Sequence, residues 1–266
     1  MLAKGDPLYV LSEGNPQTKA AKGRAFRAAI LEGQYVKSGS PQDWPARPDK
    51  PDLVAPKQLA RRRLGSIEGR AALLHAIAHI ELNAIDLAAD MIARFADCED
   101  LKDAQSDFIR DWSSVCDDES RHFVMITDRM AELGFSYGDF PAHNGLWDAA
   151  LKTKSDVAAR LAVAPLVLEA RGLDVTPGMI SKLQQVGDQE SASVLETIYT
   201  EEIGHVAIGM KWLRYVAQIR KQDPMVLFRG MVLEYYDGAI RPPLNHAARE
   251  KAGFSPDFYN DLAHNS

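Results

Sequence analysis

Hydrophobic positions in the central part of the chain recur every three or four residues, which is the spacing of amphipathic helices and not the alternation of strands. Four long segments show this spacing. They cover residues 66–95, 103–134, 155–175 and 188–218. Ser66 and Gly134 stand where a helix typically starts and ends. The pattern predicts an all-α fold, in which Pro165 disturbs the third long helix.

The connections between these segments indicate how the helices are arranged. A longer connection with a short predicted helix at residues 146–153 joins the second and third segments. Residues 176–187 predict a separate short helix with a proline in its first turn. Four long helices with one long crossover are typical of a four-helix bundle. We expect this bundle to span residues 66–220.

Further segments flank the predicted bundle. Residues 15–33 predict one amphipathic helix, and residues 223–240 predict another, followed by a tail. Residues 38–56 contain five prolines, which disrupt helices and central strands, so we expect an extended segment wrapped on the surface. The predicted divisions of one compact domain are residues 1–65, 66–220 and 221–266.

One glutamate interrupts the apolar face of each long predicted helix near its middle. These residues are Glu81, Glu119, Glu169 and Glu202. His122 and His205 follow the second and the fourth by three residues, so each lies beside its glutamate. Four carboxylates in one core would take up protons unless cations neutralised them. Two divalent metal ions would do so, and mixed glutamate and histidine ligation suits iron or manganese. The alternative is a plain bundle with salt bridges on its helix faces.

Two short motifs carry a resemblance to a known superfamily. DESRH, residues 118–122, closely resembles the acidic-Glu-x-Arg-His motif of the ferritin-like di-iron carboxylate superfamily. EEIGH, residues 201–205, matches it except that Gly204 replaces the arginine. More narrowly, RRRLGSIEGRAALLHAIAHIELNAIDLAADMIARF and ETIYTEEIGHVAIG resemble a bacterial ferritin-like family known only as domain of unknown function 455. That resemblance covers most of the chain. In the bundle alone, the chain is also similar to di-iron tRNA hydroxylases.

The superfamily resemblance implies a ligand set for two metal ions. Glu81 and His122 would bind one iron, and Glu169 and His205 would bind the other. The carboxylates that bridge them would be those of Glu119 and Glu202. Manganese or a mixed manganese–iron pair is an alternative to two irons.

Residues beside these ligands have implied or alternative roles. By the same resemblance, Asp118 and Glu201 would orient the histidine ligands, and Arg121 would pair with such an acid. Tyr199 precedes Glu202 by one turn. It is a candidate hydrogen-bonding or redox-active phenol at the site, with an ordinary core tyrosine as the alternative. Cys116 is expected to be a small buried hydrophobic residue.

Two further groups of residues have alternative interpretations. They are the pair His75 and His79 and the run Arg61-Arg62-Arg63. The two histidines lie off the Glu81 face of their helix, so we expect them to be solvated or to orient other side chains. The three arginines could contact RNA or phosphate, but salt bridges to the domain are the favoured interpretation.

Composition limits the remaining classes of protein. The net charge of −6 argues against a dedicated nucleic-acid or anionic-membrane binder. No apolar run approaches the roughly 20 residues that span a bilayer, and the N-terminus lacks the pattern of a signal peptide. Two cysteines make neither a disulfide framework nor a zinc site. We expect a cytoplasmic protein.

These features favour an oxygen-activating oxidoreductase, of hydroxylase or oxygenase type, that acts on a small organic substrate. Two cysteines cannot build the four-cysteine iron site of rubrerythrins, and no G-x-G-x-x-G motif occurs, so electrons would come from an external donor. The alternatives are a ferritin-like protein that handles iron or peroxide and a helical binding protein with a structural metal. A tRNA is a less favoured substrate than a small molecule, and the flanking segments could instead form a homodimer interface.

Overall fold

The computed structural model describes residues 2–59 and 63–264, so Arg61 and Arg62 lie outside the described residues. The described part is helical without β-strands, apart from one isolated bridge between Leu53 and Ala142, and this confirms the predicted all-α fold. The long helices are α3 (Ile67–Phe95), α4 (Gln105–Glu132), α7 (Ala170–Gln185) and α8 (Gln189–Ile219). The other elements are α1 (Leu8–Leu11), α2 (Pro16–Leu31), η1 (Pro56–Gln58), η2 (Glu99–Ala104), α5 (Gly145–Lys152), α6 (Val157–Val163), η3 (Ala164–Glu169), α9 (Pro224–Tyr235), α10 (His246–Lys251) and α11 (Pro256–His264).

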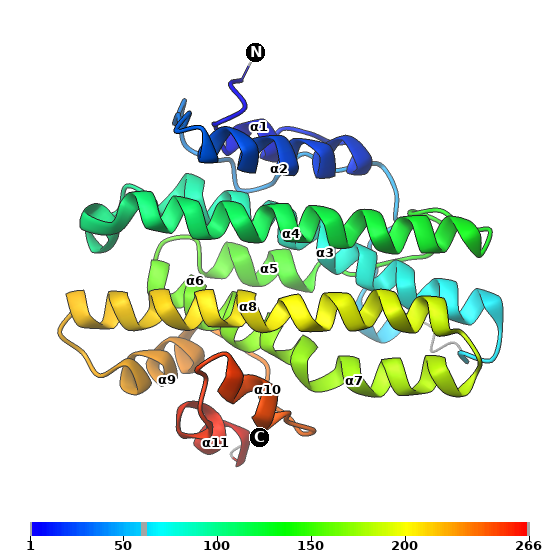
Figure 1. Ribbon diagram of the computed structural model, residues 1–266. Helices are drawn as coiled ribbons and strands as arrows, with labels where there is room; N and C mark the ends of the chain where they lie inside the picture. Colours follow the sequence, from blue (N-terminus) through cyan, green and yellow to red (C-terminus); the bar gives the residue numbers. More distant parts are fainter. Residues whose placement is uncertain (1, 60–62, 265–266) are drawn as a thin grey trace.

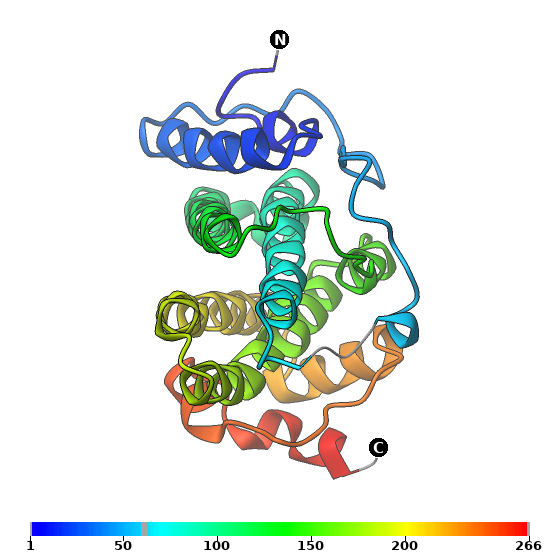
Figure 2. The same ribbon diagram turned by 90° about the vertical axis from the view of Figure 1, so that its right-hand side faces the viewer.

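Four long helical rods form the body of the molecule (Figures 1 and 2). The helix α3 pairs with α4, and α7 pairs with α8, while α4 and α8 join the two pairs. The crossover between α4 and α6 contains the predicted short helix, α5. Ser66 caps α3 by accepting a hydrogen bond from the Gly69 amide, and Gly134, at a φ of 85°, follows α4. The predicted long helices are therefore present, with α6, η3 and α7 together forming the third.

The third rod changes helical form around Pro165, as predicted. Residues Ala164–Glu169 form a π-helix, the wider form that is rare and often found at functional sites. The helix α8 approaches this segment closely at Gly209, where an added Cβ would lie 2.7 Å from the Pro165 Cβ and 2.8 Å from its Cγ. The absence of a side chain at position 209 thus permits contact between α8 and the segment that carries Glu169.

The prediction of a separate short helix at residues 176–187 is wrong, because α7 continues through Pro177 without a break. Proline lacks an amide hydrogen, so the carbonyl four residues earlier, that of Leu173, loses its helical donor. The side chain of Asn245 replaces that donor, with its Nδ2 donating to the Leu173 oxygen at 3.1 Å. A contact from the C-terminal part of the chain therefore compensates the helix for its internal proline.

The N-terminal helix α2, capped by Asn15, lies on α4 (Figure 1). Its Lys19 is buried and donates to Asp86 of α3 at 2.6 Å and to the Ala46 carbonyl at 2.8 Å. Arg47, in the predicted proline-rich extended segment, also reaches Asp86, at 3.0 Å. This segment runs along one side of the bundle (Figure 2). One buried carboxylate thus holds both N-terminal elements against α3.

The helices α9, α10 and α11 pack at the other side of the bundle, below α8 in Figure 1. The predicted helix at residues 223–240 is observed as α9, which ends at Tyr235, and the predicted helical tail contains α10 and α11. Arg249 of α10 is buried and donates through Nε and Nη2 to the two Asp174 oxygens of α7, at 2.9 and 2.7 Å. This bidentate ion pair fixes the C-terminal helices to the third rod.

The helix α3 corrects the expectation that no segment is apolar enough to cross a membrane. By length and composition alone it passes that test. However, 72% of its most apolar window is buried inside the protein, and its core face carries Glu81. These features are typical of the central helix of a soluble protein.

Adding a methyl group at Gly209 should destabilise the protein. The Gly209→Ala side chain would overlap the rigid Pro165 ring, and overpacking of this kind costs about 1–3 kcal/mol. Gly204→Ala is the matched control on the same helix, because a Cβ there meets no atom within 4 Å. It should leave stability unchanged or raise it by up to about 1 kcal/mol through helix propensity. Urea denaturation measures both values, and equal effects of the two substitutions would contradict the packing described here.

Candidate metal centre

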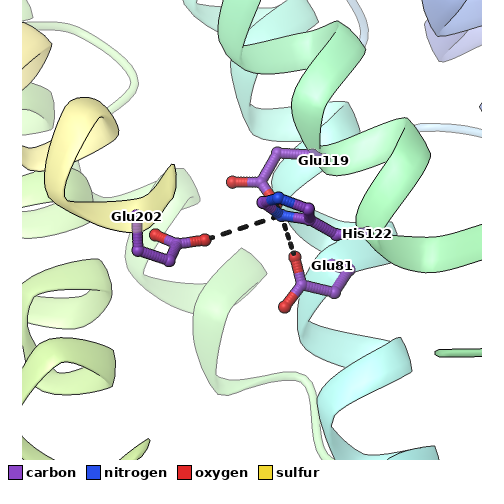
Figure 3. Close-up of side chains that lie close together, drawn as sticks. All are labelled: Glu81, Glu119, His122 and Glu202. Atoms are coloured by element: carbon purple, nitrogen blue, oxygen red, sulfur yellow. Dashed lines mark hydrogen bonds and ion pairs between the residues drawn. The ribbon is translucent and has the colours of Figure 1, made fainter. Parts of the chain in front are cut away.

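Side chains from three helices converge near the middle of the bundle. Glu81 comes from α3, Glu119 and His122 from α4, and Glu202 from α8 (Figure 3). One potential ligand atom from each of these residues lies within 4.8 Å of the others. The first three residues are buried and Glu202 is half-buried. This group of carboxylate and imidazole side chains can hold a metal ion.

The imidazole of His122 faces three of the carboxylates through Nδ1. This nitrogen lies 3.3 Å from Glu81 Oε2, 3.3 Å from Glu119 Oε2 and 3.8 Å from Glu202 Oε1. Figure 3 shows the Glu81 and Glu202 carboxylates directed toward the ring. The side chain of His122 is fully buried, so solvent does not screen these interactions.

His205 faces two of the same carboxylates from the other helix pair. Its Nδ1 lies 3.1 Å from Glu119 Oε1 and 3.5 Å from Glu202 Oε1. The centroids of the His122 and His205 rings are 5.8 Å apart. The Glu119 and Glu202 carboxylates are therefore shared by both histidines, whereas Glu81 contacts only His122 among the ion pairs of the described residues.

The second nitrogen of each histidine faces an acid on the opposite helix. His122 Nε2 lies 2.7 Å from Glu201 Oε2 of α8, and His205 Nε2 lies 3.3 Å from Asp118 Oδ2 of α4. Arg121 joins these acids, because its Nη2 donates to Asp118 and, at 2.9 Å, to Glu201. The two motifs DESRH and EEIGH thus interlock, with the acid of each holding the histidine of the other.

The pKa shifts identify which of these acids stay ionised. Partial burial opposes ionisation of Glu201, but hydrogen bonds from His122 and Arg121 outweigh it and hold its pKa below the ordinary value. Partial burial also opposes ionisation of Asp118, and hydrogen bonds from His205 and Arg121 lower its pKa likewise. An ionised acid only accepts hydrogen bonds. Both Nε2 atoms therefore carry a proton that they donate to these carboxylates.

The carboxylates inside the cluster behave differently. Burial raises the pKa of Glu81 well above its ordinary value, and the Glu119 charge raises it further. Burial, together with the charges of Glu202 and Glu119, likewise raises the pKa of Glu169. Burial opposes the charged form of Glu119 too, but a hydrogen bond with Glu81 and the charge of His205 lower its pKa. Without metal, the cluster thus holds protons on some carboxylates and none on Glu119.

The histidines of the cluster are drawn toward their charged form. Burial lowers the pKa of His122, but hydrogen bonds to Glu119 and Glu81 outweigh it and raise the pKa to about 11. Burial also opposes protonation of His205, and the Glu202 and Glu119 charges raise its pKa well above the ordinary value. The protons on the histidines and carboxylates supply positive charge beside the ionised carboxylates. A metal cation in the same place would supply positive charge too.

Glu169 comes from the π-helix and lies outside the group of four residues whose ligand atoms are within 4.8 Å of one another, but it lines the same cavity as Glu81, Glu119 and Glu202. It has an unsatisfied oxygen. Its Oε2 is buried without a hydrogen-bond partner. The Nδ1 of His205 is also buried without a hydrogen bond of good geometry, although Glu119 Oε1 lies 3.1 Å from it. A buried polar atom without a partner costs free energy unless another group engages it. Glu169 and His205 were predicted to bind the same metal ion, and both carry such an atom.

A cavity of about 180 Å³ opens onto all four cluster carboxylates. It lies between α3 and α7, with α8 and the start of α5 completing its wall. Its lining consists of Ile77, Ile80, Glu81, Ala84, Glu119, Leu146, Leu168, Glu169, Arg171, Gly172, Val175, Thr176, Met179, Leu195, Ile198 and Glu202. Apart from the carboxylates and Arg171, this lining is almost entirely apolar. Periodicity marked several of these residues as core, but no sequence signal showed that they leave a chamber.

Tyr199 and Cys116 lie apart from the carboxylates. The Tyr199 hydroxyl accepts a hydrogen bond from Asn245 Nδ2 at 2.9 Å, which places it against the C-terminal part of the chain, and Tyr199 does not line the cavity. Cys116 is fully buried, and burial raises the pKa of its thiol far above the ordinary value. It therefore behaves as a small hydrophobic residue.

His75 and His79 are buried, which corrects the expectation that they are solvated. His79 Nδ1 lies 2.8 Å from the Tyr137 hydroxyl oxygen, and His75 Nε2 accepts a hydrogen bond from the Gly138 amide at 3.0 Å. The Tyr137 ring stacks on both imidazoles. Burial lowers the pKa of His75 to about 4 and that of His79 to about 3. The pair anchors the crossover to α3 in the neutral form.

The metal-free chain should lose stability as the pH rises above 4.5, the ordinary pKa of Glu169. Between the ordinary pKa of Glu169 and its raised folded value, the folded chain holds a proton that the unfolded chain has released, so rising pH favours unfolding. Each such group contributes at most about 1.4 kcal/mol per pH unit. Glu169→Gln removes one contribution, so its free energy of unfolding should fall less steeply with pH.

Urea denaturation in the presence of a chelator measures this slope. Glu196→Gln, which neutralises an exposed carboxylate of α8, is the matched control and should keep the wild-type slope. An unchanged slope in Glu169→Gln would show that the Glu169 pKa is not raised.

Comparisons with known proteins extend over most of the chain. A family model described as "Protein of unknown function (DUF455)" matches residues 12–260. A protein of Haemophilus influenzae, described as an uncharacterized protein, is 42% identical over 222 residues, which make up 81% of this chain and 75% of that protein. No solved structure matches the chain. The matched region contains every residue of the candidate metal centre, and the chain belongs to the DUF455 family of proteins of unknown function.

Proposed function

We propose that this chain is a ferritin-like, dinuclear metal carboxylate protein that activates dioxygen to oxidise a small organic substrate. The placement of the two histidines carries the proposal. The Nδ1 atoms of His122 and His205 come from different helices and face the same two carboxylates, those of Glu119 and Glu202. Two imidazoles that share one pair of carboxylates favour two metal ions over one.

The protonation chemistry of these residues fits metal ligation. The ionised Asp118 and Glu201 accept the Nε2 protons, so a neutral imidazole presents the lone pair of Nδ1 to the cluster. A carboxylate that holds the outer nitrogen is the usual arrangement around a ligating histidine. Metal ions would also engage Glu169 Oε2 and His205 Nδ1, two buried atoms that make no hydrogen bond of good geometry.

Charge balance supports two divalent ions. The charges of the four cluster glutamates would be neutralised by two such ions, with neutral histidines completing the ligand set. Oxygen and imidazole ligands without thiolates suit iron, with manganese or a mixed pair as alternatives. We assign one ion to Glu81 and His122 and the other to Glu169 and His205. The two shared carboxylates, Glu119 and Glu202, would bridge them.

A bound pair of reduced iron ions would supply dioxygen binding and two-electron chemistry. In the proposed hydroxylation, a substrate C–H bond breaks and a C–O bond forms with one oxygen atom of dioxygen. The other oxygen atom leaves as water, with two electrons from an external reductant and two protons. The chain supplies the position of the substrate and a site that excludes bulk water.

The cavity beside the carboxylates favours an enzyme over the alternatives. Ile77, Leu195 and Ile198 help to form an apolar chamber that reaches the cluster itself. A protein that stores iron, handles peroxide or uses metal only for stability needs no chamber of this kind, whereas a substrate with apolar groups does. This observation favours the oxidoreductase over the iron-handling protein.

The proposal also covers the substrate class, the electron donor and the cellular location. We propose a small-molecule substrate, a separate protein as electron donor and a cytoplasmic location. A tRNA substrate is a secondary proposal, because the net charge of −6 disfavours nucleic acid. A homodimer built through the flanking segments is a further secondary proposal.

Removing a shared carboxylate should release more metal than removing a histidine. Glu119→Gln changes a ligand of both proposed metal ions, so bound metal should fall from about two ions per chain to nearly none. His205→Ala should leave about one ion, held mainly by Glu81 and His122. Elemental analysis of purified protein measures the content, with Glu196→Gln as the exposed control and circular dichroism as the check on folding. Full metal content in both site variants would reject the ligand assignment.

The iron-loaded chain should react with dioxygen. Anaerobic reconstitution with ferrous iron, followed by exposure to oxygen, should produce an absorption band between the near ultraviolet and the visible. Glu202→Ala should lose this band together with its metal. A chain that binds two irons yet shows no spectral change with oxygen would leave the metal with a structural role.

A further inference from the structure

A second cavity adjoins the chamber at the cluster. It measures about 520 Å³ and is lined by residues that include His143, Asp174, Tyr236 and Arg241. The two cavities share Ile80, Leu146, Leu168 and Arg171. We call the smaller cavity the inner chamber and the larger one the vestibule. Ile80 is a large apolar residue with 47% of its surface exposed, and it lies where the two spaces meet.

The vestibule carries a positive charge. Its lining includes the guanidinium groups of Arg171, Arg241 and Arg249, against the single carboxylate of Asp174. Asp174 is already bound by Arg249 through two hydrogen bonds of 2.9 and 2.7 Å. Arg171 lies 3.5 Å from the same carboxylate, and its Nη1 donates to the Arg241 and Pro243 carbonyls at 2.7 and 2.9 Å. Three guanidinium groups against one carboxylate still leave the lining with excess positive charge, which attracts an anion.

Arg249 also has a nitrogen with no partner. Only 1% of its surface is exposed, and its Nε and Nη2 atoms are used by Asp174. Its Nη1 is buried without a hydrogen-bond partner. The rings of Tyr259 and Phe254 hold the guanidinium, at 4.7 and 5.4 Å from its central carbon. A fixed guanidinium with an unsatisfied donor, in the wall of a cationic cavity, is suited to an anionic group.

The inner chamber is suited to a short apolar chain. Its volume of about 180 Å³ and its almost entirely apolar lining are suited to the methylene groups of such a chain. Gly172 contributes to the wall, and a Cβ at this position would meet no atom within 4 Å. The chamber thus owes part of its open space to the missing side chain at position 172.

We propose that the substrate is an amphipathic anion, with a short apolar chain in the inner chamber and a carboxylate or phosphate headgroup in the vestibule. Arg171 and Arg249 bind the headgroup, and Ile80, Leu146 and Leu168 surround the point where the chain enters. This inference rests on the proposed function, because it makes the inner chamber the place where the substrate meets the metal centre.

Calorimetric titration of the full-length chain tests this proposal without turnover. The probes are octanoate, octyl phosphate and 1-octanol. At least one anion should bind saturably with one molecule per chain, and 1-octanol should bind about tenfold or more weakly, because it lacks the charge-assisted hydrogen bonds. Tighter binding of octanoate or of octyl phosphate identifies the headgroup. Equal affinity for the alcohol and the anions, or no saturable binding of any probe, would overturn the proposal.

Matched variants locate the binding site. Gly172→Leu should fill the inner chamber and weaken anion binding by about tenfold or more, whereas Gly178→Leu, at an exposed position of the same helix with an open Cβ direction, should not. Arg171→Gln should weaken the binding of anions but not of 1-octanol, and Lys182→Gln is its charge-matched control. Unchanged anion binding in Gly172→Leu would reject the inner chamber as the site.

Metal content measured on the same samples separates the two proposals. Anion binding by a chain that takes up no metal would reject the metal centre and leave the amphipathic ligand. Full metal content without anion binding would reject the ligand and leave the metal centre.

Discussion

The rest of this structure depends on one constraint, the repulsion among four glutamate carboxylates at the low-dielectric centre of the bundle. Elsewhere in the core, buried aspartates have cationic partners: Asp86 has Lys19, Asp90 has Arg160, and Asp174 has Arg249. The four central glutamates share only two histidines. In the metal-free state the deficit of positive charge is met by protons, because the raised pKa values of Glu81, Glu169 and both histidines retain them. A pair of divalent cations would meet it without them.

The surrounding structure holds the central glutamates and histidines in place. The acids of the two motifs fix the outer nitrogens of the histidines, and Arg121 ties those acids together. The π-helix brings Glu169 to the cluster, and Gly209 lets α8 pack against that segment. Asn245 then satisfies the carbonyl freed by the proline in α7. Packing against the rest of the domain thus sustains local features that would be costly in isolation.

Much of this fold could be predicted from the sequence because helical periodicity is a strong local signal. The same periodicity showed that Glu81, Glu119, Glu169 and Glu202 lie on core faces. It could not show that α7 continues through Pro177, since the compensating donor lies 68 positions away in sequence, at Asn245. Tertiary packing also buries His75 and His79 under Tyr137 and forms the chamber between α3 and α7. Neither feature produces a periodic pattern of hydrophobic residues in the sequence.

The central claim is that two metal ions lie between the two histidines. Anomalous diffraction at the iron absorption edge, from crystals grown after iron reconstitution, tests it most directly. Two peaks are expected among the carboxylates, one next to Nδ1 of His122 and the other next to Nδ1 of His205. A single peak, or iron bound away from these two nitrogens, would contradict it.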